Sequence, residues 1–323
     1  MRIVFMGTPD FAVPCLEILI KNGYEVAGVV TQPDRPVGRK QSELQAPPVK
    51  QCALALGVSV VLQPEKVKTQ EFADAVRALA PDLIVTAAYG RIITRAVLDI
   101  PALGCINVHG SLLPKYRGAA PMQWAIINGE TVTGITTMFM DEGIDTGDML
   151  LKREVPISIG MTYAELYEEL KALGAETLLE TVRELEAGTL KRTPQNHAEA
   201  TTVPMIKKDM GLIDWGKSAA DIHNLVRGTD PWPGAFTYYK GGRLKIWKTG
   251  LCQAGDAAAA ETADSASCKD GPIPGRICRI LKDSFTVATG SGLLKVAEVQ
   301  FESGRKLAVS ECGHNMDEGE VLG

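Results

Sequence analysis

The first half of the chain alternates short apolar segments with segments of helical spacing, and this alternation restricts the possible folds more than any other feature. The apolar segments, which are as short as buried strands, are residues 3–6, 25–31, 58–62, 83–87 and 105–108. The segments with helical spacing between them are residues 11–22, 48–56 and 69–79. Short buried strands separated by helices favour a Rossmann-like α/β domain with a mostly parallel sheet. Ligands of such sheets bind at the carboxyl ends of the strands.

The second half follows a different pattern. Two more strands and a long amphipathic helix are predicted at residues 135–140, 149–156 and 161–185. The polar stretch that follows has no periodicity, and short β segments bounded by glycines then predict a small barrel. These β segments are residues 237–239, 244–249, 277–280, 285–289 and 293–299. We therefore predict a first domain at residues 1–186, a linker at 187–203 and a second domain at 204–323.

Composition argues against several classes of protein. The formal net charge is −5, so a nucleic-acid partner would need a local basic patch. The seven cysteines form no C-x-x-C pair, which indicates reduced thiols in a cytosolic protein. No apolar stretch reaches the ~20 residues of a membrane span, and we expect a cytoplasmic protein without a secretion signal. The scattered histidines predict no zinc site, and the turn after the first strand lacks G-x-G-x-x-G, which argues against NAD.

The segment Asn107-Val108-His109 ends a predicted buried strand and runs into an irregular loop that contains glycine. Because side chains alternate along a strand, Asn107 and His109 point to the same side, at the edge where ligands bind. An asparagine amide can donate to a developing oxyanion, and a histidine can protonate it or carry a proton. An isolated histidine at a strand end is more often structural, but this spacing before a glycine loop favours a catalytic pair.

Residues 141–148 form a second candidate, a loop with four carboxylates between two predicted strands. An ordinary turn or a cation site is the alternative, although the glycines at positions 143 and 147 do not fit EF-hand spacing. A carboxylate from this loop beside His109 would orient the imidazole and favour its charged form. Distance along the sequence does not establish that the two groups meet.

Residues 32–50 are a long connection between a strand and a helix, and they carry more basic than acidic side chains. A solvated surface loop is the simpler interpretation. A basic loop that enters a nucleic-acid groove is the alternative, with Arg39 and Lys40 at its centre.

Together these motifs resemble those of the folate-dependent formyltransferases. Residues 107–118 fit N-x-H-x-S-L-L-P-x-x-R-G and residues 143–148 fit G-[IL]-D-T-G-D, in the order and spacing of the family. The opening I-V-F-M-G-T-P-D-F-A, Q-P-D-R-P at residues 32–36 and P-W-P at residues 231–233 add to the resemblance. It covers the chain to about residue 247 and returns at residue 274, whereas the Ala-rich loop at residues 252–273 is longer than in many members.

The resemblance implies transfer of the formyl group of 10-formyltetrahydrofolate to the α-amino group of methionine on initiator tRNA, without a metal ion. It also implies that Asn107 and protonated His109 stabilise the formyl oxygen, while Asp145 holds His109 and takes the amine proton. The implied tetrahydrofolate contacts are Ser111, Leu112, Leu113 and Pro114, with Ala88, Tyr89, Gly90 and Asp141 beside the pterin ring. The second domain should resemble an oligonucleotide-binding (OB) fold, and the implied tRNA contacts are Arg39, Lys40, Lys207, Lys208, Lys245 and Lys248.

Two alternative functions can be weighed against this one. A formyltransferase that acts on a small amine, such as an amino sugar or a ribonucleotide, would share Asn107, His109 and Asp145. It would not need the basic loop or the second domain. A tRNA-binding protein without activity would not need the three candidate catalytic residues. Since the chain carries both sets of features, we expect an enzyme that formylates the methionine carried by initiator tRNA. We expect this enzyme to be a monomer.

Overall fold

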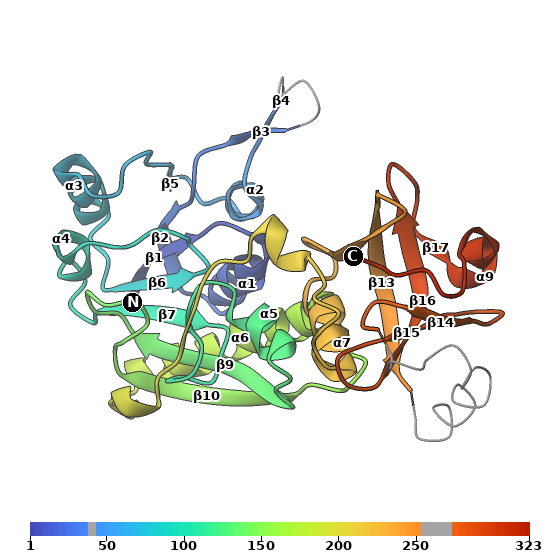
Figure 1. The fold of residues 1–323 in the computed structure, drawn as a ribbon. Helices are drawn as coiled ribbons and strands as arrows, with labels where there is room; N and C mark the ends of the chain where they lie inside the picture. Colours follow the sequence, from blue (N-terminus) through green and yellow to red (C-terminus); the bar gives the residue numbers. More distant parts are fainter. Residues whose placement is uncertain (38–42, 253–272) are drawn as a thin grey trace. The chain divides into compact units, whose positions relative to one another are not determined.

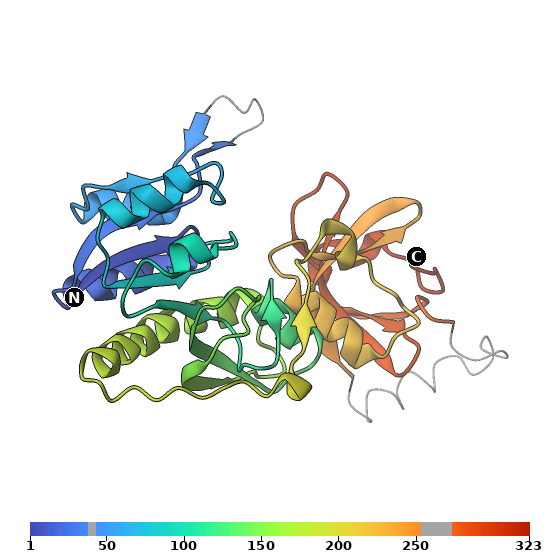
Figure 2. The same ribbon diagram turned by 90° about the vertical axis from the view of Figure 1, so that its left-hand side faces the viewer.

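The computed structural model describes residues 1–37, 43–252 and 273–323, which divide into two compact units (Figures 1 and 2). The first unit comprises Met1–Pro121, Val132–Pro156 and Tyr167–Val203. The second unit comprises Met122–Thr131, Ile157–Leu166 and Pro204–Gly323. In the described part of the chain, no helix combines the length and apolar character that a membrane span requires.

A seven-stranded sheet forms the centre of the first unit, in the order β10-β9-β7-β6-β1-β2-β5. The strands that pair parallel are β1 (Arg2–Gly7), β2 (Glu25–Val30), β5 (Val61–Leu62), β6 (Leu83–Ala87) and β7 (Cys105–His109). Strand β9 (Val132–Phe139) pairs antiparallel with both β7 and β10 (Met149–Pro156). The prediction of a mostly parallel, Rossmann-like sheet is therefore confirmed.

Helices cover both faces of this sheet. Apolar side chains point to both faces along its strands, and each face packs against helices. Val4, Ile84 and Cys105 pack in one cluster with α3 (Gln70–Ala78) and α4 (Arg95–Leu98). On the opposite face, α6 packs closely enough that a Cβ at Gly174 would lie 3.3 Å from the Val108 side chain. The remaining helices of the first unit are α1 (Val13–Lys21), α2 (Pro48–Ala55) and most of α6 (Tyr163–Glu186).

Capping residues lie at the ends of these helices. Thr69 precedes α3, and its hydroxyl accepts a hydrogen bond from the backbone N–H of Phe72 at 3.3 Å, which caps the helix. Gly23 and Gly57 follow α1 and α2 with φ values of +82° and +79°, a conformation that glycine adopts without steric cost. These two glycines therefore end the helices where the sequence predicts.

The second unit contains a six-stranded antiparallel sheet, in which β17 pairs with β16 beside the order β12-β13-β16-β15-β14. Its strands are β12 (Ala235–Tyr239), β13 (Gly242–Leu251), β14 (Ile277–Ile280), β15 (Phe285–Ala288), β16 (Leu293–Phe301) and β17 (Leu307–Ala308). Helix α7 (Ala219–Gly228) contributes Ile222 and Val226 to the same buried core as Leu244 and Val296. The barrel-like β domain is confirmed, whereas α7 is an element that the sequence analysis did not identify.

Two predicted loops contain short strands. The connection at residues 32–50 includes a hairpin of β3 (Arg35–Val37) and β4 (Glu43–Gln45). The polar stretch at residues 187–203 includes β11 (Thr202–Val203), which pairs parallel with β8 (Arg117–Gly118). The Ala-rich stretch at residues 254–266 lies outside the described residues. The remaining short elements are η1 (Asp10–Ala12), α5 (Pro121–Ile127), η2 (His197–Glu199), η3 (Lys208–Gly211), α9 (Val309–Cys312) and η4 (Gly313–Asn315).

Candidate active site

Asn107 and His109 lie at the carboxyl end of β7, on the same side of the strand. Asn107 is half-buried, and its Oδ1 accepts a hydrogen bond from the Thr86 hydroxyl of the neighbouring strand β6 at 2.8 Å. This bond identifies Oδ1 as the acceptor end of the amide. The opposite end of the amide, Nδ2, carries two N–H donors.

The imidazole of His109 is 6% exposed and has a contact at each ring nitrogen. Its Nε2 lies 2.9 Å from the backbone oxygen of Tyr116, which can only accept, so Nε2 carries a proton and donates it. Its Nδ1 lies 3.6 Å from Oδ2 of Asp145. The carbonyl thus sets the tautomer, and the carboxylate faces the second nitrogen.

Asp145 lies in the loop between β9 and β10, with a φ of +54° that few non-glycine residues adopt. Its Oδ2 accepts a hydrogen bond from the backbone N–H of Gly118 at 2.8 Å. The carboxylate is therefore fixed on one side by Gly118 and faces His109 on the other. The structure brings together two groups that lie far apart in the sequence.

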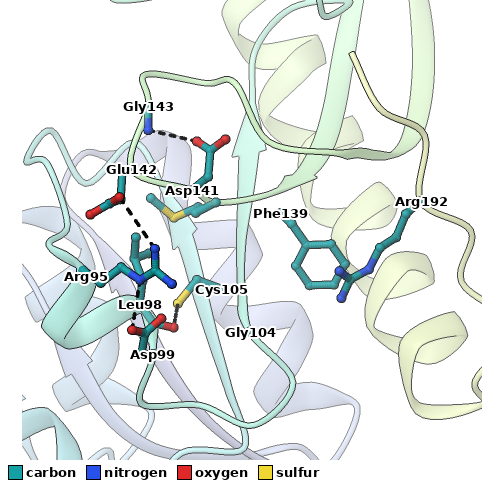
Figure 3. A pocket seen from close by; sticks show the side chains of 11 residues that line it. Arg95, Leu98, Asp99, Gly104, Cys105, Phe139, Asp141, Glu142, Gly143 and Arg192 are labelled. Carbon is teal, nitrogen blue, oxygen red and sulfur yellow. Dashed lines mark hydrogen bonds and ion pairs between the residues drawn. The ribbon is translucent and has the colours of Figure 1, made fainter.

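A cavity of about 490 Å³ lies beside this loop, and we call it the Met140 cavity (Figure 3). It is lined by Arg95, Leu98, Asp99, Gly104, Cys105, Phe139, Met140, Asp141, Glu142, Gly143 and Arg192. Within it the Arg95 guanidinium lies 3.0 Å from Asp99 and 3.6 Å from Glu142, and Arg192 lies 3.8 Å above the Phe139 ring. Burial raises the pKa of the Cys105 thiol to about 12, so this side chain remains protonated and neutral. The lining thus combines apolar surface with fixed polar groups.

Met140 connects this cavity with the catalytic candidates. Its sulfur lies 3.3 Å from the Thr86 hydroxyl, the same group that donates to Asn107. Met140 also packs against the cluster on the α3 and α4 face of the sheet. The cavity and the Asn107 amide therefore lie on the same face.

A second cavity, of about 440 Å³, lies at the carboxyl ends of β1, β2 and β6, and we call it the Thr8 cavity. It is lined by Thr8, Pro9, Gln32, Pro33, Arg35, Gln45, Ala46, Pro47, Pro48 and Ala88. Thr8 and Gln32 both donate side-chain hydrogen bonds to the backbone oxygen of Tyr89, at 3.1 and 3.0 Å. These bonds hold the loops after three strands together around a mainly apolar hollow.

The predicted folate residues occupy two kinds of position. Ser111 and Leu113 are fully buried, and the Ser111 hydroxyl donates to the backbone oxygen of Lys115 at 2.7 Å, so both shape the turn after β7. Tyr89 is also buried, whereas Asp141 is exposed and accepts hydrogen bonds from Gly143 and Thr146. The residues that remain accessible or half-buried are Ala88, Gly90, Leu112 and Pro114. Of the predicted folate residues, Asp141 lines the Met140 cavity and Ala88 lines the Thr8 cavity.

The predicted tRNA residues are dispersed. Arg39 and Lys40 lie outside the described residues. Lys207, Lys208 and Lys248 are exposed in the second unit, and Lys245 is half-buried there. Burial, with Arg243 nearby, lowers the pKa of Lys245.

Lys245 belongs to a face of the second unit where basic and aromatic side chains alternate, which we call the Trp247 face. Lys245 and Lys306 lie 5.0 and 4.1 Å from the Trp247 ring, and Arg243 lies 3.7 Å above the Phe236 ring. On β13 these outward side chains alternate with Leu244 and Ile246, which are buried in the core. Surfaces that bind single-stranded nucleic acid combine basic side chains with aromatic rings on which bases stack.

Three residues of the candidate site were not assigned roles by the sequence analysis. Thr86 orients Asn107, Arg117 is buried beside the site, and Gln195 donates to the backbone of the Asp145 loop. Arg117 belongs to the matched motif at residues 107–118, which is a signal for its importance. Gln195 lies in the polar stretch without periodicity, where no sequence pattern marks it. The described residues contain no group of three or more His, Cys, Asp or Glu side chains arranged to hold a metal ion.

Comparison with known proteins finds two matching family models and full-length relatives. The formyl transferase family model matches residues 1–182, and the formyl transferase C-terminal domain model matches residues 205–315. A methionyl-tRNA formyltransferase of Acetivibrio thermocellus is 56% identical over 325 residues, with 100% of both chains covered. The methionyl-tRNA formyltransferase of Clostridioides difficile is 48% identical, again over 100% of both chains.

Solved structures share the fold at lower identity. The sugar 3N-formyltransferase WlaRD has a TM-score of 0.65 at 19% identity, over 92% of this chain and 97% of that one. HypX from Aquifex aeolicus in complex with tetrahydrofolic acid has a TM-score of 0.62 at 19% identity, over 97% of this chain and 46% of that one. Because of the family models and the full-length relatives, the chain belongs to the formyl transferase family, among the methionyl-tRNA formyltransferases.

Proposed function

We infer that the chain transfers the formyl group of 10-formyltetrahydrofolate to the free amino group of methionyl initiator tRNA. The observation that carries this inference is the pairing of His109 with Asp145 beside the Asn107 amide, at the carboxyl edge of the sheet. The full-length similarity to methionyl-tRNA formyltransferases supports the same reaction.

The three side chains have separate tasks in this reaction. Asn107 presents amide N–H donors to the formyl oxygen as negative charge develops there, and the imidazole of His109, at the same end of β7, can carry a proton. Donors aimed at a developing oxyanion are each worth roughly 10²–10³ in rate. Asp145 holds His109 in place and accepts the proton that the amine loses, directly or through a water. A bond forms between the amine nitrogen and the formyl carbon, the bond from that carbon to N10 of the folate breaks, and N10 gains a proton.

The Met140 cavity is suited to the formyl donor. It lies on the same face of the sheet as Asn107, through the chain of contacts from Met140 to Thr86 to Asn107. Its volume of about 490 Å³ is within the ~300–1,000 Å³ of small-molecule sites, and its apolar and polar lining suits a flat ring with many hydrogen-bonding groups. We assign the pterin ring to this cavity, with the turn at Asp141 and Glu142 at its border.

The Thr8 cavity is suited to the acceptor end of the tRNA. It lies at the ends of β1, β2 and β6, next to β7 in the sheet, so a group held there can reach His109. Its prolines and alanines offer apolar contact to a methionine side chain, and Arg35 offers charge to a phosphate. The amine of the methionyl group would then enter from the side opposite to the folate ring.

The second unit contributes further tRNA contacts. The Trp247 face offers rings for stacking, and Lys245 and Lys306 offer charge to phosphates. Lys207, Lys208 and Lys248 extend the proposed phosphate contacts on the same unit. We propose that one monomer suffices for the reaction, because both cavities and all three catalytic candidates belong to one chain.

A single assay tests the function. The purified chain is given 10-formyltetrahydrofolate together with methionyl initiator tRNA, methionyl elongator tRNA, or free amines that include an amino sugar and a ribonucleotide amine. We expect formylation of methionyl initiator tRNA alone. Transfer to a small amine with comparable kcat/KM would instead identify a small-amine formyltransferase, and binding of tRNA without transfer would identify an inactive tRNA-binding protein.

A further inference from the structure

Gln195 lies in the segment between α6 and β11 and is 6% exposed. Its amide takes part in four hydrogen bonds. The oxygen Oε1 accepts from Nε and Nη2 of Arg117, at 3.0 and 2.7 Å. The nitrogen Nε2 donates to the backbone oxygens of Asp145 and Gly147, at 2.9 and 2.7 Å. A buried amide with all four positions used has one orientation only.

Arg117 is the middle residue of the segment 116–118, whose backbone contacts His109 and Asp145. The backbone oxygen of Tyr116 accepts from His109, and the backbone N–H of Gly118 donates to the Asp145 carboxylate. Between them the Arg117 side chain, 7% exposed, reaches Gln195 and also donates to Nδ1 of His197 at 3.1 Å. The segment is itself held by parallel pairing of β8 with β11. A displacement of the segment would therefore move both His109 and Asp145.

Asp145 needs such support because of its backbone. A φ of +54° is uncommon for a non-glycine residue, and such conformations persist when the surroundings fix them. The Gln195 amide bonds the backbone oxygen of this same residue and that of the second residue after it. Because two N–H groups of the Arg117 guanidinium donate to Gln195 Oε1, they also polarise the amide and strengthen its N–H donors.

We propose that Gln195 and Arg117 are positioning residues that hold the Asp145 loop so that its carboxylate faces His109. This inference rests on the proposed function, since it concerns the rate of formyl transfer at that site. Neither side chain touches the reacting atoms. A displacement of ~1 Å of a catalytic group can cost roughly 100-fold in rate, so the loss appears in kcat.

Two variants separate the two halves of the Gln195 amide. Gln195→Ala removes all four bonds. Gln195→Glu retains an acceptor for Arg117, strengthened by charge, but places carboxylate oxygen against the two backbone oxygens and removes both donors to the loop. If the donors to the loop matter for catalysis, both variants lose kcat even though Gln195→Glu retains its contact with Arg117.

The chain offers a matched control in Gln123. This glutamine is also 6% exposed, and its Nε2 also lies within hydrogen-bond distance of two backbone oxygens, those of Gly228 and Trp232. Gln123 and both of these partners belong to the second unit, and none of them belongs to the Asp145 loop. Gln123→Ala therefore measures the cost of removing a buried amide without disturbing Asp145.

The test uses the full-length chain, with kcat, the KM of each substrate and the thermal unfolding midpoint measured for every variant. We expect Gln195→Ala and Gln195→Glu to lower kcat by roughly 10- to 100-fold while both KM values change less than about 3-fold. Gln123→Ala should lower the unfolding midpoint and leave kcat within about 2-fold. Should Gln195→Ala fail to fold, Arg117→Lys provides the measurement, with an expected loss of kcat because lysine lacks the paired donors.

Wild-type kcat for either Gln195 variant, or an equal loss of kcat in Gln123→Ala, would overturn the inference. A wild-type chain that does not formylate methionyl initiator tRNA would instead overturn the proposed function. The two failures are therefore distinguishable in the same set of assays.

Discussion

The Asp145 carboxylate uses one oxygen for two contacts: Oδ2 lies 3.6 Å from Nδ1 of His109 and accepts a hydrogen bond from Gly118 at 2.8 Å. The backbone therefore fixes the carboxylate against the imidazole. Nε2 of His109 donates to the Tyr116 oxygen and Nδ1 faces Asp145, so both ring nitrogens face a fixed protein group. The contact between His109 and Asp145 therefore connects the end of β7 with the β9–β10 loop.

Removal of the imidazole should abolish most of the activity. We expect His109→Ala to lower kcat at least ~100-fold, since both proton transfer and stabilisation of the oxyanion are lost. Circular dichroism and tRNA affinity, measured on the same protein, should remain those of the wild type. Retention of kcat would mean that the transfer takes place elsewhere in the molecule.

The charge of Asp145 can be removed without a change in shape. Asparagine tolerates a positive φ nearly as well as aspartate, so Asp145→Asn avoids the strain that alanine would meet at φ +54°. We expect a fall in kcat of roughly 100-fold or more, because the amide cannot accept the proton that the amine loses. An unchanged pH–rate profile with near wild-type kcat would contradict the role of the carboxylate.

The orientation of Asn107 depends on Thr86. Valine has nearly the same shape as threonine, so Thr86→Val removes the hydroxyl that donates to Asn107 Oδ1. We expect kcat to fall roughly 10-fold, less than the loss from Asn107→Ala, because the amide remains present but loses its fixed orientation. Rapid-quench measurement of the transfer step distinguishes this effect from slow product release. Equal losses in Thr86→Val and Asn107→Ala would indicate that Thr86 does more than orient the amide.

Lys245 should affect the binding of tRNA and not the binding of 10-formyltetrahydrofolate. We expect Lys245→Ala to raise the KM for methionyl initiator tRNA. The slope of the logarithm of the tRNA binding constant against the logarithm of the salt concentration should become smaller in magnitude by about 1, since one phosphate contact is lost. The KM for 10-formyltetrahydrofolate should not change. Lys21→Ala, at an exposed lysine on α1 of the first unit, is the matched control and should leave the salt slope unchanged.

His223 makes the stability of the second unit sensitive to pH. Burial lowers the pKa of His223 below its ordinary value of 6.5, with Arg227 nearby adding to the effect. Its neutral form donates from Nε2 to the Ile159 oxygen and accepts from Thr249, both at 2.8 Å. A lowered pKa in the folded state means that the unfolded chain binds protons first, so stability is complete above about pH 6.5 and decreases as the pH falls below it.

Thermal unfolding between pH 7.5 and 5.5 measures this effect. The midpoint should fall across the interval in the wild type and vary less in His223→Gln, which keeps a hydrogen-bonding side chain but does not titrate. Parallel pH dependence in the two proteins would assign the effect to other groups.

The sequence predicts the fold where each local pattern has one physical solution. Leu83–Ala87 is a buried run of strand length, and the structure has β6 at these residues. Gly23 and Gly57 end their helices because few other residues accept their φ values. The direction of β9, antiparallel to its neighbours, could not be predicted, because alternation of side chains does not depend on the direction of a strand.

The candidate site was predictable in part. Asn107 and His109 share one strand, so alternation alone places them on one side. The proximity of Asp145 depends on the path of the β9–β10 loop, and the contacts of Gln195 depend on a segment held by side-chain hydrogen bonds and by β11. Such a segment buries no regular apolar face, and it therefore has no periodicity in the sequence.

The central claim is that Asn107, His109 and Asp145 act together on one formyl group, and a single-turnover experiment tests it most directly. Enzyme saturated with 10-formyltetrahydrofolate is mixed with methionyl initiator tRNA, and the rate of transfer is measured for the wild type, His109→Ala, Asp145→Asn and the double variant. We predict that the double variant is about as slow as the slower single variant, because groups that act as a unit are not additive. Losses that multiply in the double variant would show that His109 and Asp145 act independently, which would contradict the mechanism.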